Sequence, residues 1–179
     1  IDFLNKVGAF YVNIVRNTPL TLIIVFCNIG FIVNLGMSFT NDIARNNIIW
    51  AIIGLSFYHA AFVCEALRSG VNTVPVGQAE AARSIGLTFS QSLSEVLLPQ
   101  AFRGAITPLG NTLIALTKNT TVATAIGVAE ISGLMKEMME FRADLIIVIF
   151  LLVAIGFVIL TLPIGLLTTR LSTKLAVKR

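Results

Sequence analysis

Four long apolar stretches constrain this chain more than any other feature of its sequence. They lie between Arg16 and Asp42, between Arg45 and Glu65, from about Ala105 to Ala129, and from Leu145 to Thr169. A helix needs roughly 20 apolar residues to cross the hydrocarbon core of a bilayer, and each stretch is long enough. Because the runs are continuous rather than alternating, they fit membrane helices better than barrel strands.

The composition leads to the same conclusion. Of the 179 residues, 56% are hydrophobic and only 12% are charged. These are too few polar residues to cover a water-soluble globule of this size. We therefore expect an all-α membrane protein with a single transmembrane domain over residues 1–179 and spans at about 18–39, 47–67, 105–128 and 145–168. The chain does not begin with Met, and no signal-peptide pattern precedes its first span, so we expect it to start inside a longer protein.

Basic residues indicate how the spans are oriented. If the segment from Arg68 to Arg103 is cytoplasmic, only Arg45, Lys136 and Arg142 lie outside. The inner side then collects Lys6, Arg16, Arg68, Arg83, Arg103, Arg170, Lys174, Lys178 and Arg179. This bias follows the positive-inside rule and predicts a cytoplasmic C-terminus. Since the basic residues lie near helix ends, we interpret them as a topology signal and expect no nucleic acid partner.

The ends of the first apolar stretch also predict local structure. Phe3, Val7, Phe10 and Ile14 recur at helical spacing before Pro19, so we expect a helix that lies on or enters the inner surface. The short link at 40–47 forces the first two spans into an antiparallel pair.

The central loop, residues 70–103, has its own helical pattern. Residues 77–85 are good helix formers followed by Gly86, which suits the left-handed position after a helix. Thr88 and Gln91 then have the spacing of a capping box. Four apolar residues follow at helical spacing before Pro99, namely Phe89, Leu93, Val96 and Leu97. We predict two short helices turned about Gly86 that dock to a cytoplasmic partner; the alternative is an interfacial helix on lipid.

The same loop resembles a known family motif. The pattern is Glu80-Ala81-Ala82, three residues, Gly86, nine residues, then Val96-x-Leu98-Pro99. It resembles the EAA loop of permease subunits of bacterial ABC importers, with Val96 where that family usually has isoleucine. The flanking sequences, including RNTPLTL from position 16 and LIALTKNTT from 113, are similar to the polar amino acid branch and most of all to glutamate importer permeases.

The resemblance implies a type I ABC importer permease bundle in the bacterial cytoplasmic membrane. Such permeases usually have five spans, so four here would mean that the family's first span is missing. Its partners would be a second permease subunit, a pair of cytoplasmic ATPases that bind ATP and Mg, and an external amino acid binding protein. The EAA loop would seat in the ATPase and drive alternating access. The coupling residues carried over from the motif are Glu80, Ala81, Ala82, Gly86, Val96, Leu98 and Pro99, and the apolar helical pattern adds Phe89 and Leu93.

One face of the third span is a candidate solute path. Lys118 lies within the span, where a lysine costs roughly 2.5 to 3.5 kcal/mol on insertion scales. At about 100° per residue, one arc of about 140° holds Asn111, Thr117, Lys118, Thr121 and Thr124. A polar face of this kind is expected of a helix that lines a water-accessible path. Lys118 could offset a glutamate carboxylate; a gate or ion pair with Glu65 is equally compatible with the pattern.

Three further polar residues in or next to the second span have simpler interpretations. Glu65 and Arg68, three positions apart, fit a structural ion pair. His59 could titrate or bind solute, but among apolar neighbours it fits a hydrogen-bonded packing residue better.

The residue inventory argues against an enzyme. The sequence has no Gly-rich phosphate loop ending in Lys and Ser or Thr, and its one histidine and two separated cysteines exclude an ordinary metal cluster. We therefore expect no cofactor in this chain. An ATP-independent channel or secondary carrier for a small polar solute is the alternative function, although we find no inverted repeat with broken mid-span helices.

Overall fold

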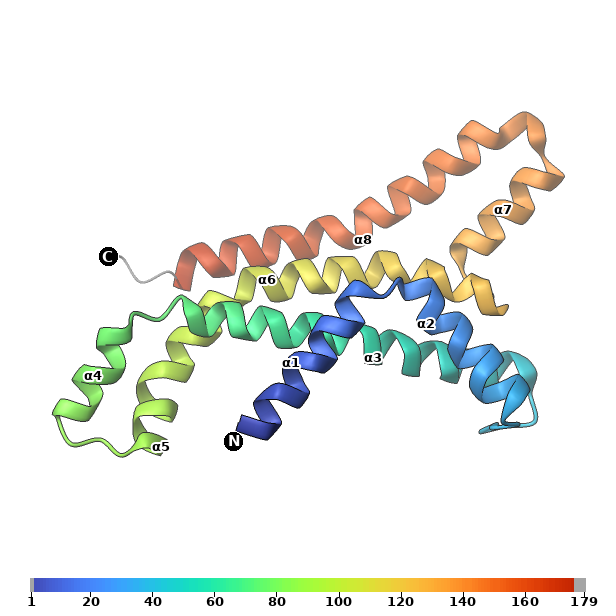
Figure 1. Cartoon of the computed structure of the whole chain (residues 1–179). Helices are drawn as coiled ribbons and strands as arrows, with labels where there is room; N and C mark the ends of the chain where they lie inside the picture. The colour runs from blue at the N-terminus through green and yellow to red at the C-terminus, as the bar shows by residue number, and fades with distance from the viewer. Residues whose placement is uncertain (1, 176–179) are drawn as a thin grey trace. The chain divides into compact units, whose positions relative to one another are not determined.

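The computed structural model describes residues 2–175, a part of the chain that contains helices and turns but no strand (Figure 1). The elements in chain order are α1 (Asp2–Asn17), α2 (Leu20–Phe26), the π-helix η1 (Cys27–Asn34), α3 (Ile43–Asn72), α4 (Val76–Ser84), α5 (Phe89–Gln91), the π-helix η2 (Ser92–Leu97), α6 (Leu98–Asn119), the 3₁₀-helix η3 (Thr120–Ile126), α7 (Ile131–Phe141), the 3₁₀-helix η4 (Ala143–Leu145) and α8 (Ile146–Leu175). Lys178 and Arg179, which belong to the predicted inner charge set, lie outside the described residues.

The described residues form two compact units. The first contains the chain up to Ala61 together with Ala115–Leu162, and the second contains Phe62–Ile114 together with the residues from Pro163 onward. Three long helices, α3, α6 and α8, each contribute to both units.

A sharp corner joins α1 and α2 in the first unit. The axis of α1 is bent by 101° from that of the α2 and η1 segment. Pro19 disfavours helical backbone at Thr18 and is itself the N-cap residue of α2. The Thr18 hydroxyl donates to the Ile14 carbonyl at 2.8 Å, so α1 is closed by the residue that begins the corner. The predicted helix before Pro19 is confirmed.

The core of the first unit lies between α2, α3 and η3. Leu20 and Ile24 from α2 pack with Leu55 of α3 and Ile126 of η3, together with small alanines from both partners. A second cluster joins Val12 and Val15 of α1 to Ala61 of α3. Helix α1 therefore packs on α3 through Val12 and Val15, whereas the residues whose spacing predicted this helix stay exposed, namely Phe3, Val7, Phe10 and Ile14.

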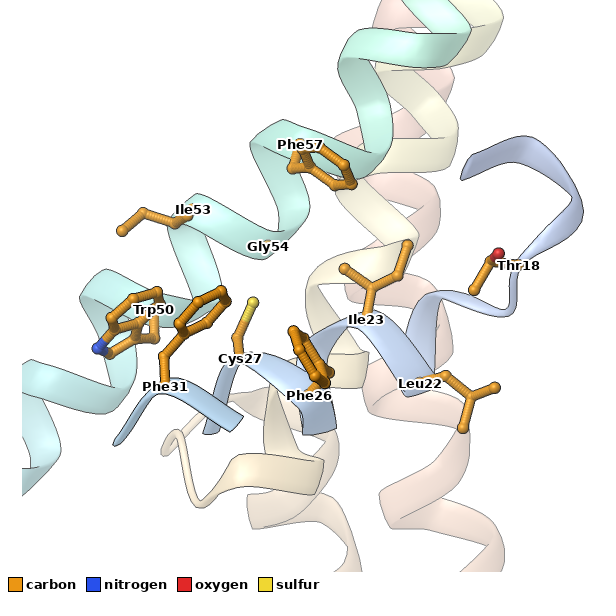
Figure 2. A pocket seen from close by; sticks show the side chains of 10 residues that line it. All are labelled: Thr18, Leu22, Ile23, Phe26, Cys27, Phe31, Trp50, Ile53, Gly54 and Phe57. Carbon is orange, nitrogen blue, oxygen red and sulfur yellow. The ribbon is translucent and has the colours of Figure 1, made fainter. Parts of the chain in front are cut away.

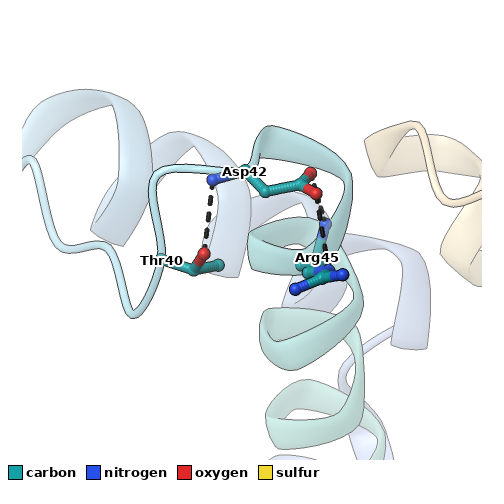
Figure 3. A network of polar contacts seen from close by, with 3 residues as sticks. All are labelled: Thr40, Asp42 and Arg45. Carbon is teal, nitrogen blue, oxygen red and sulfur yellow. Dashed lines mark hydrogen bonds and ion pairs between the residues drawn. The ribbon is translucent and has the colours of Figure 1, made fainter.

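Asp42 determines where α3 begins (Figure 3). Its carboxylate accepts the Arg45 backbone N–H at 3.2 Å and lies 3.5 Å from the Arg45 guanidinium Nε. Its own N–H donates to the Thr40 hydroxyl at 3.3 Å. A carboxylate placed just before a helix satisfies an otherwise unpaired N–H and complements the helix dipole.

In the second unit, α3 and α6 cross at small residues. A Cβ added to Gly70 would lie 2.8 Å from the Ala105 nitrogen, and one added to Gly104 would lie 3.2 Å from the Thr73 Cβ. A Cβ added to Gly110 of α6 would lie 2.7 Å from the Thr168 Cβ of α8. Membrane helices commonly approach one another through such small residues.

Length and apolar composition single out two helical segments as able to cross a membrane, Ile43–Asn72 and Ala143–Leu175. A third would be the bent pair Asp2–Asn17 and Leu20–Asn34, taken as one span. The expected third span at 105–128 is divided between α6, which ends at Asn119, and the 3₁₀-helix η3. The positions of the spans stay predictions.

Candidate functional site

The turn between α4 and α5 is built from two complementary caps. After α4, Gly86 has φ of 86° and donates to the Arg83 carbonyl at 2.9 Å, while Leu87 donates to the Ala82 carbonyl at 3.1 Å. This pair of bonds is a Schellman motif, which ends a helix at a left-handed residue. Thr88 is the N-cap of α5, so only Gly86 and Leu87 lie between it and Ile85, the C-cap of α4.

The predicted capping box at Thr88 and Gln91 is present. The Gln91 N–H donates to the Thr88 hydroxyl at 3.4 Å, and the Thr88 N–H donates to the Gln91 side-chain carbonyl at 3.0 Å. A further bond crosses the turn, since the Gln100 side chain donates to that of Gln78 at 3.3 Å. The segment therefore has a defined shape that is held by local bonds.

The second helix of the loop differs from the expectation that it is short and ends at Pro99. Pro99 is the second residue of α6, and helical structure continues from Phe89 to Asn119. Pro99 lacks the N–H that an α-helix would direct to the Glu95 carbonyl. The π-helix η2 directly before it loosens the backbone, and such bulges let a helix pass a disrupted bond.

The side chains of the predicted coupling loop divide into an outer and an inner set. Phe89 is 80% exposed, and Glu80, Ala81 and Gly86 are also exposed. Ala82 is buried, at 3% exposure, in α4, the helix that contacts η2. Leu93 and Val96 are half-buried, while Leu98 and Pro99 are exposed.

The charged residues of α4 stay available for a partner. Glu80 and Arg83 are both exposed and take part in no ion pair within residues 2–175. The Glu80 backbone carbonyl accepts a bond from the Ser84 hydroxyl at 3.0 Å, which leaves its carboxylate uninvolved. The exposed side chains of this turn thus include two opposite charges, Glu80 and Arg83, and the aromatic ring of Phe89.

The polar residues of the expected solute path have different environments. Lys118 and Asn111 are exposed on α6, and Thr117 is half-buried. Thr121 and Thr124 belong instead to η3, where residues three apart eclipse each other. The Thr121 hydroxyl donates to the Lys118 carbonyl at 2.8 Å, and the Thr124 hydroxyl donates to the Glu130 carboxylate. The two threonine hydroxyls therefore already serve the structure.

Glu65 and His59 also contact protein groups. The Glu65 carboxylate accepts two bonds from the Arg68 guanidinium, at 3.0 Å and 2.5 Å, as expected for a structural pair at this spacing. His59 is buried and lies 3.4 Å from the Asn119 amide nitrogen, measured at its Nε2. Glu65 and Lys118 belong to different units, so their pairing stays a hypothesis.

The sequence patterns did not predict the role of Glu130. This residue is the N-cap of α7, and its two oxygens accept the backbone N–H groups of Ser132 and Gly133 at 2.9 Å and 2.8 Å. The hydroxyls of Ser132 and Thr124 donate to it as well. Burial raises the pKa of the Glu130 carboxyl, but these hydrogen bonds outweigh burial and hold the pKa below its ordinary value. The signal was an acidic residue directly before a helical pattern.

Metal binding has no support among the described residues. No group of three or more His, Cys, Asp or Glu side chains in residues 2–175 is placed to hold an ion.

Comparison with known proteins defines the class. Over residues 2–177 the chain matches the family of binding-protein-dependent transport system inner membrane components. Because this match takes in nearly the whole chain, the chain belongs to that family and is a permease subunit of an ABC transporter.

Individual relatives agree with this membership. The glutamate transport system permease protein GluC of Corynebacterium efficiens is 52% identical, an alignment that covers all of this chain and 81% of the relative. GluC of Corynebacterium glutamicum is 50% identical over the same shares. The probable glutamine ABC transporter permease GlnM of Bacillus subtilis is 34% identical, over 91% of this chain and 72% of GlnM. The resemblance to glutamate permeases drawn from the sequence motifs is confirmed.

Solved structures confirm the fold class. A crystal structure of an amino acid ABC transporter with histidines matches with a TM-score of 0.83 at 24% identity, covering 97% of this chain and 78% of that one. The MetNI methionine ABC transporter in an inward-facing conformation matches with a TM-score of 0.75 at 24% identity, over 98% of this chain and 76% of that one. At this identity the likeness establishes the all-helical permease fold alone.

Proposed function

We propose that this chain is the transmembrane subunit of an ATP-driven importer that moves glutamate across the cytoplasmic membrane by alternating access. The observation that carries the proposal is the 52% identity with a glutamate permease over the whole of this chain. The energy comes from a separate pair of ATPase subunits, and an extracytoplasmic binding protein delivers the solute to a pair of permease subunits.

The double-capped turn of α4 and α5 is the part that receives the ATPase motion. Its caps leave little freedom at Gly86 and Thr88, and a coupling element has to be rigid to transmit displacement. Phe89 supplies an apolar anchor for a groove on the partner, and Glu80 and Arg83 supply charged contacts at its rim. Buried aromatic anchors with a polar rim are the usual composition of a protein interface.

Lys118 is the residue most suited to attract an acidic solute. It is the exposed cation of the predicted path, and Thr121 bonds its carbonyl rather than its ammonium group. Asn111 and Thr117 are further candidates on α6, whereas Thr121 and Thr124 act mainly in the local structure. A positive charge near the path would lower the cost of moving a carboxylate through the membrane.

Reconstitution tests the proposal. The permease, its ATPase and its binding protein are assembled in proteoliposomes, and labelled glutamate uptake is measured against competing glutamine, histidine and arginine. We expect uptake that requires ATP and the binding protein and that unlabelled glutamate inhibits most strongly. ATP-independent uptake would support the channel or carrier instead. Equal or stronger inhibition by another amino acid would overturn the assignment of glutamate while leaving the importer intact.

A further inference from the structure

The first unit contains an apolar groove between α3 and the segment of α2 and η1 (Figure 2). Among the described residues, no charged side chain lines it. The Thr18 hydroxyl and the Trp50 indole, which line it, already donate to the carbonyls of Ile14 and Met37, at 2.8 Å and 3.3 Å. A carboxylate or ammonium placed in this groove would lose its hydration without a replacement. The groove therefore offers no binding group to an acidic solute, whereas the predicted path offers the exposed Lys118.

Glu130 joins two other elements of the same unit, the 3₁₀-helix η3 and the helix α7. Its carboxylate accepts the backbone N–H groups of Ser132 and Gly133 in the first turn of α7, at 2.9 Å and 2.8 Å. It also accepts the hydroxyl of Ser132 and that of Thr124, which belongs to η3. Hydrogen bonds to a charged acceptor are stronger than those between neutral groups. One side chain thus holds η3 against α7.

The two elements also pack closely at this point. A Cβ added to Gly133 of α7 would lie 3.1 Å from the Thr124 Cγ2, so a larger residue there would press on η3. The Ser132 hydroxyl lies 3.3 Å from the Thr124 hydroxyl and donates to the Thr121 carbonyl at 3.5 Å. The position of η3 is therefore fixed both by packing and by the bonds of the Glu130 carboxylate.

Hydrogen bonds continue from η3 to Lys118. This helix follows α6 directly, and the Thr121 hydroxyl donates to the Lys118 carbonyl at 2.8 Å. A 3₁₀-helix turns about 120° per residue and an α-helix about 100°. Each residue that changes from one winding to the other therefore rotates the side chains that precede it by roughly 20° relative to η3. Where the winding changes thus determines the direction of Lys118.

We propose that Glu130 is a positioning residue for Lys118, which it holds in place through Thr124 and the winding of η3. The inference rests on the proposed function, in which Lys118 serves the transport of an acidic solute. Glu130 itself contacts only protein groups of η3 and α7 in this arrangement, so its effect on transport has to pass through Lys118.

The first experiment measures the position of residue 118 by its reactivity. A single cysteine replaces Lys118 after Cys27 and Cys64 have been replaced by alanine, and a water-soluble thiol reagent is applied to the complete transporter in vesicles. The rate is compared with and without Glu130→Gln, and Glu137→Gln, which changes an exposed carboxylate of α7, is the control. We expect Glu130→Gln alone to change the rate severalfold. An unchanged rate, or no reaction in any of these proteins, would overturn the proposal.

The second experiment asks whether Glu130 acts through Lys118. Glutamate uptake by the complete transporter in proteoliposomes is compared for the wild type, Lys118→Gln, Glu130→Gln and the double variant. We expect Glu130→Gln to lower uptake roughly fivefold when Lys118 is present, which is a coupling of the size found between residues of one hydrogen-bond network. With Lys118 replaced, the same change should have little further effect, because the residue that Glu130 positions is gone. Equal losses in both backgrounds would assign Glu130 a merely structural role.

A second variant keeps the test independent of the cap of α7. Ser132→Ala removes one hydroxyl from the Glu130 carboxylate and keeps the Ser132 backbone N–H that caps the helix. We expect this complex to melt close to the wild-type temperature and to lose uptake by a smaller factor than Glu130→Gln, again only when Lys118 is present. Wild-type uptake in Ser132→Ala, or a loss that persists without Lys118, would contradict the proposal.

This inference and the proposed function can fail separately. If the wild-type complex takes up no glutamate, the proposed function fails, and the cysteine at position 118 still tests what Glu130 does. If the wild type takes up glutamate and Glu130→Gln acts equally with and without Lys118, the importer stands and the positioning role of Glu130 falls.

Discussion

At the scale of single residues, Lys118 offers the sharpest test of solute recognition. We expect Lys118→Gln to lower glutamate transport roughly ten- to hundredfold, because a hydrogen bond to a charged group contributes roughly 1.5–3 kcal/mol and about 1.4 kcal/mol corresponds to a factor of ten. Uptake by proteoliposomes measures the effect. Lys136→Gln, which removes an exposed lysine from α7, serves as the control.

The two interpretations of Lys118 predict different solute dependence. A lysine that contacts the side-chain carboxylate of glutamate should, when neutralised, reduce glutamate transport more than any residual transport of glutamine. A lysine that acts in a gate with Glu65 should reduce both by the same factor. An equal reduction would therefore assign Lys118 to gating and remove it from solute recognition.

Glu130 is expected to make stability depend on pH on the acid side. Its pKa in the folded protein lies below the ordinary value of 4.5, so the folded state favours the charged form. The stabilisation of the folded protein by the charged carboxylate is complete above the ordinary pKa of 4.5, and it is lost as the pH falls through the lower pKa of the folded state. We expect Glu130→Gln to cost about 1 kcal/mol at neutral pH as a weakened cap and to flatten this acid dependence.

Thermal unfolding of the purified complex between neutral pH and acid measures this effect. Glu137→Gln changes an exposed carboxylate on the same helix and is the control. An unaltered acid profile in Glu130→Gln, together with a normal melting temperature at neutral pH, would show that the hydrogen bonds to Glu130 do not stabilise the loop.

At the scale of elements, the α4–α5 turn depends on one left-handed glycine. Gly86 has φ of 86° with open space around it, so alanine there meets backbone strain rather than a clash. This strain is worth roughly 1–2 kcal/mol. Gly77 lies in helical α4, also in open space, and alanine at that position should stabilise the helix by up to about 1 kcal/mol.

We therefore expect Gly86→Ala to weaken the coupling of ATP hydrolysis to uptake and Gly77→Ala to leave it intact. The ratio of glutamate transported to ATP hydrolysed in proteoliposomes measures the coupling. If both variants show the wild-type ratio, the shape of this turn is not what transmits the motion.

Local patterns predicted this turn well because its determinants are local. Gly86 and the box of Thr88 and Gln91 satisfy backbone groups within three or four residues, and they appear in the structure as expected. The continuation through Pro99 was not predictable in the same way, because the π-helix η2 has no simple sequence signature. The Glu130 cluster was missed because it joins residues of η3 and α7 across a left-handed turn at Gly127.

The pattern of spans was predictable only in part, for a physical reason. Apolar composition identifies segments that prefer lipid, but it does not say where a helix changes its winding. The 3₁₀ turn after Asn119 and the π-helix after Phe26 both lie inside expected spans. Which face of α6 and η3 is polar also depends on this winding. The hydroxyls of Thr121 and Thr124 donate to the Lys118 carbonyl and the Glu130 carboxylate, and the place of these two residues on the solute path stays a prediction.

At the scale of the whole molecule, the positive-inside distribution predicts which residues face each side of the membrane. Single cysteines at Lys174 and Glu137, both exposed, are introduced after Cys27 and Cys64 have been replaced by alanine. A membrane-impermeant maleimide should label Glu137→Cys in intact cells and Lys174→Cys only after the membrane is opened. The reverse pattern would invert the topology and place the α4–α5 turn outside.

The corner of 101° between α1 and the α2 segment has a consequence for where this protein can reside. A straight helix adapts to a thicker or thinner bilayer by tilting. If α1 lies along the inner surface, as the sequence predicts, the helix joined to it at nearly a right angle has little freedom to tilt. Hydrophobic mismatch would instead be borne at Thr18 and Pro19. We expect the transporter to tolerate only a narrow range of acyl lengths in its host membrane.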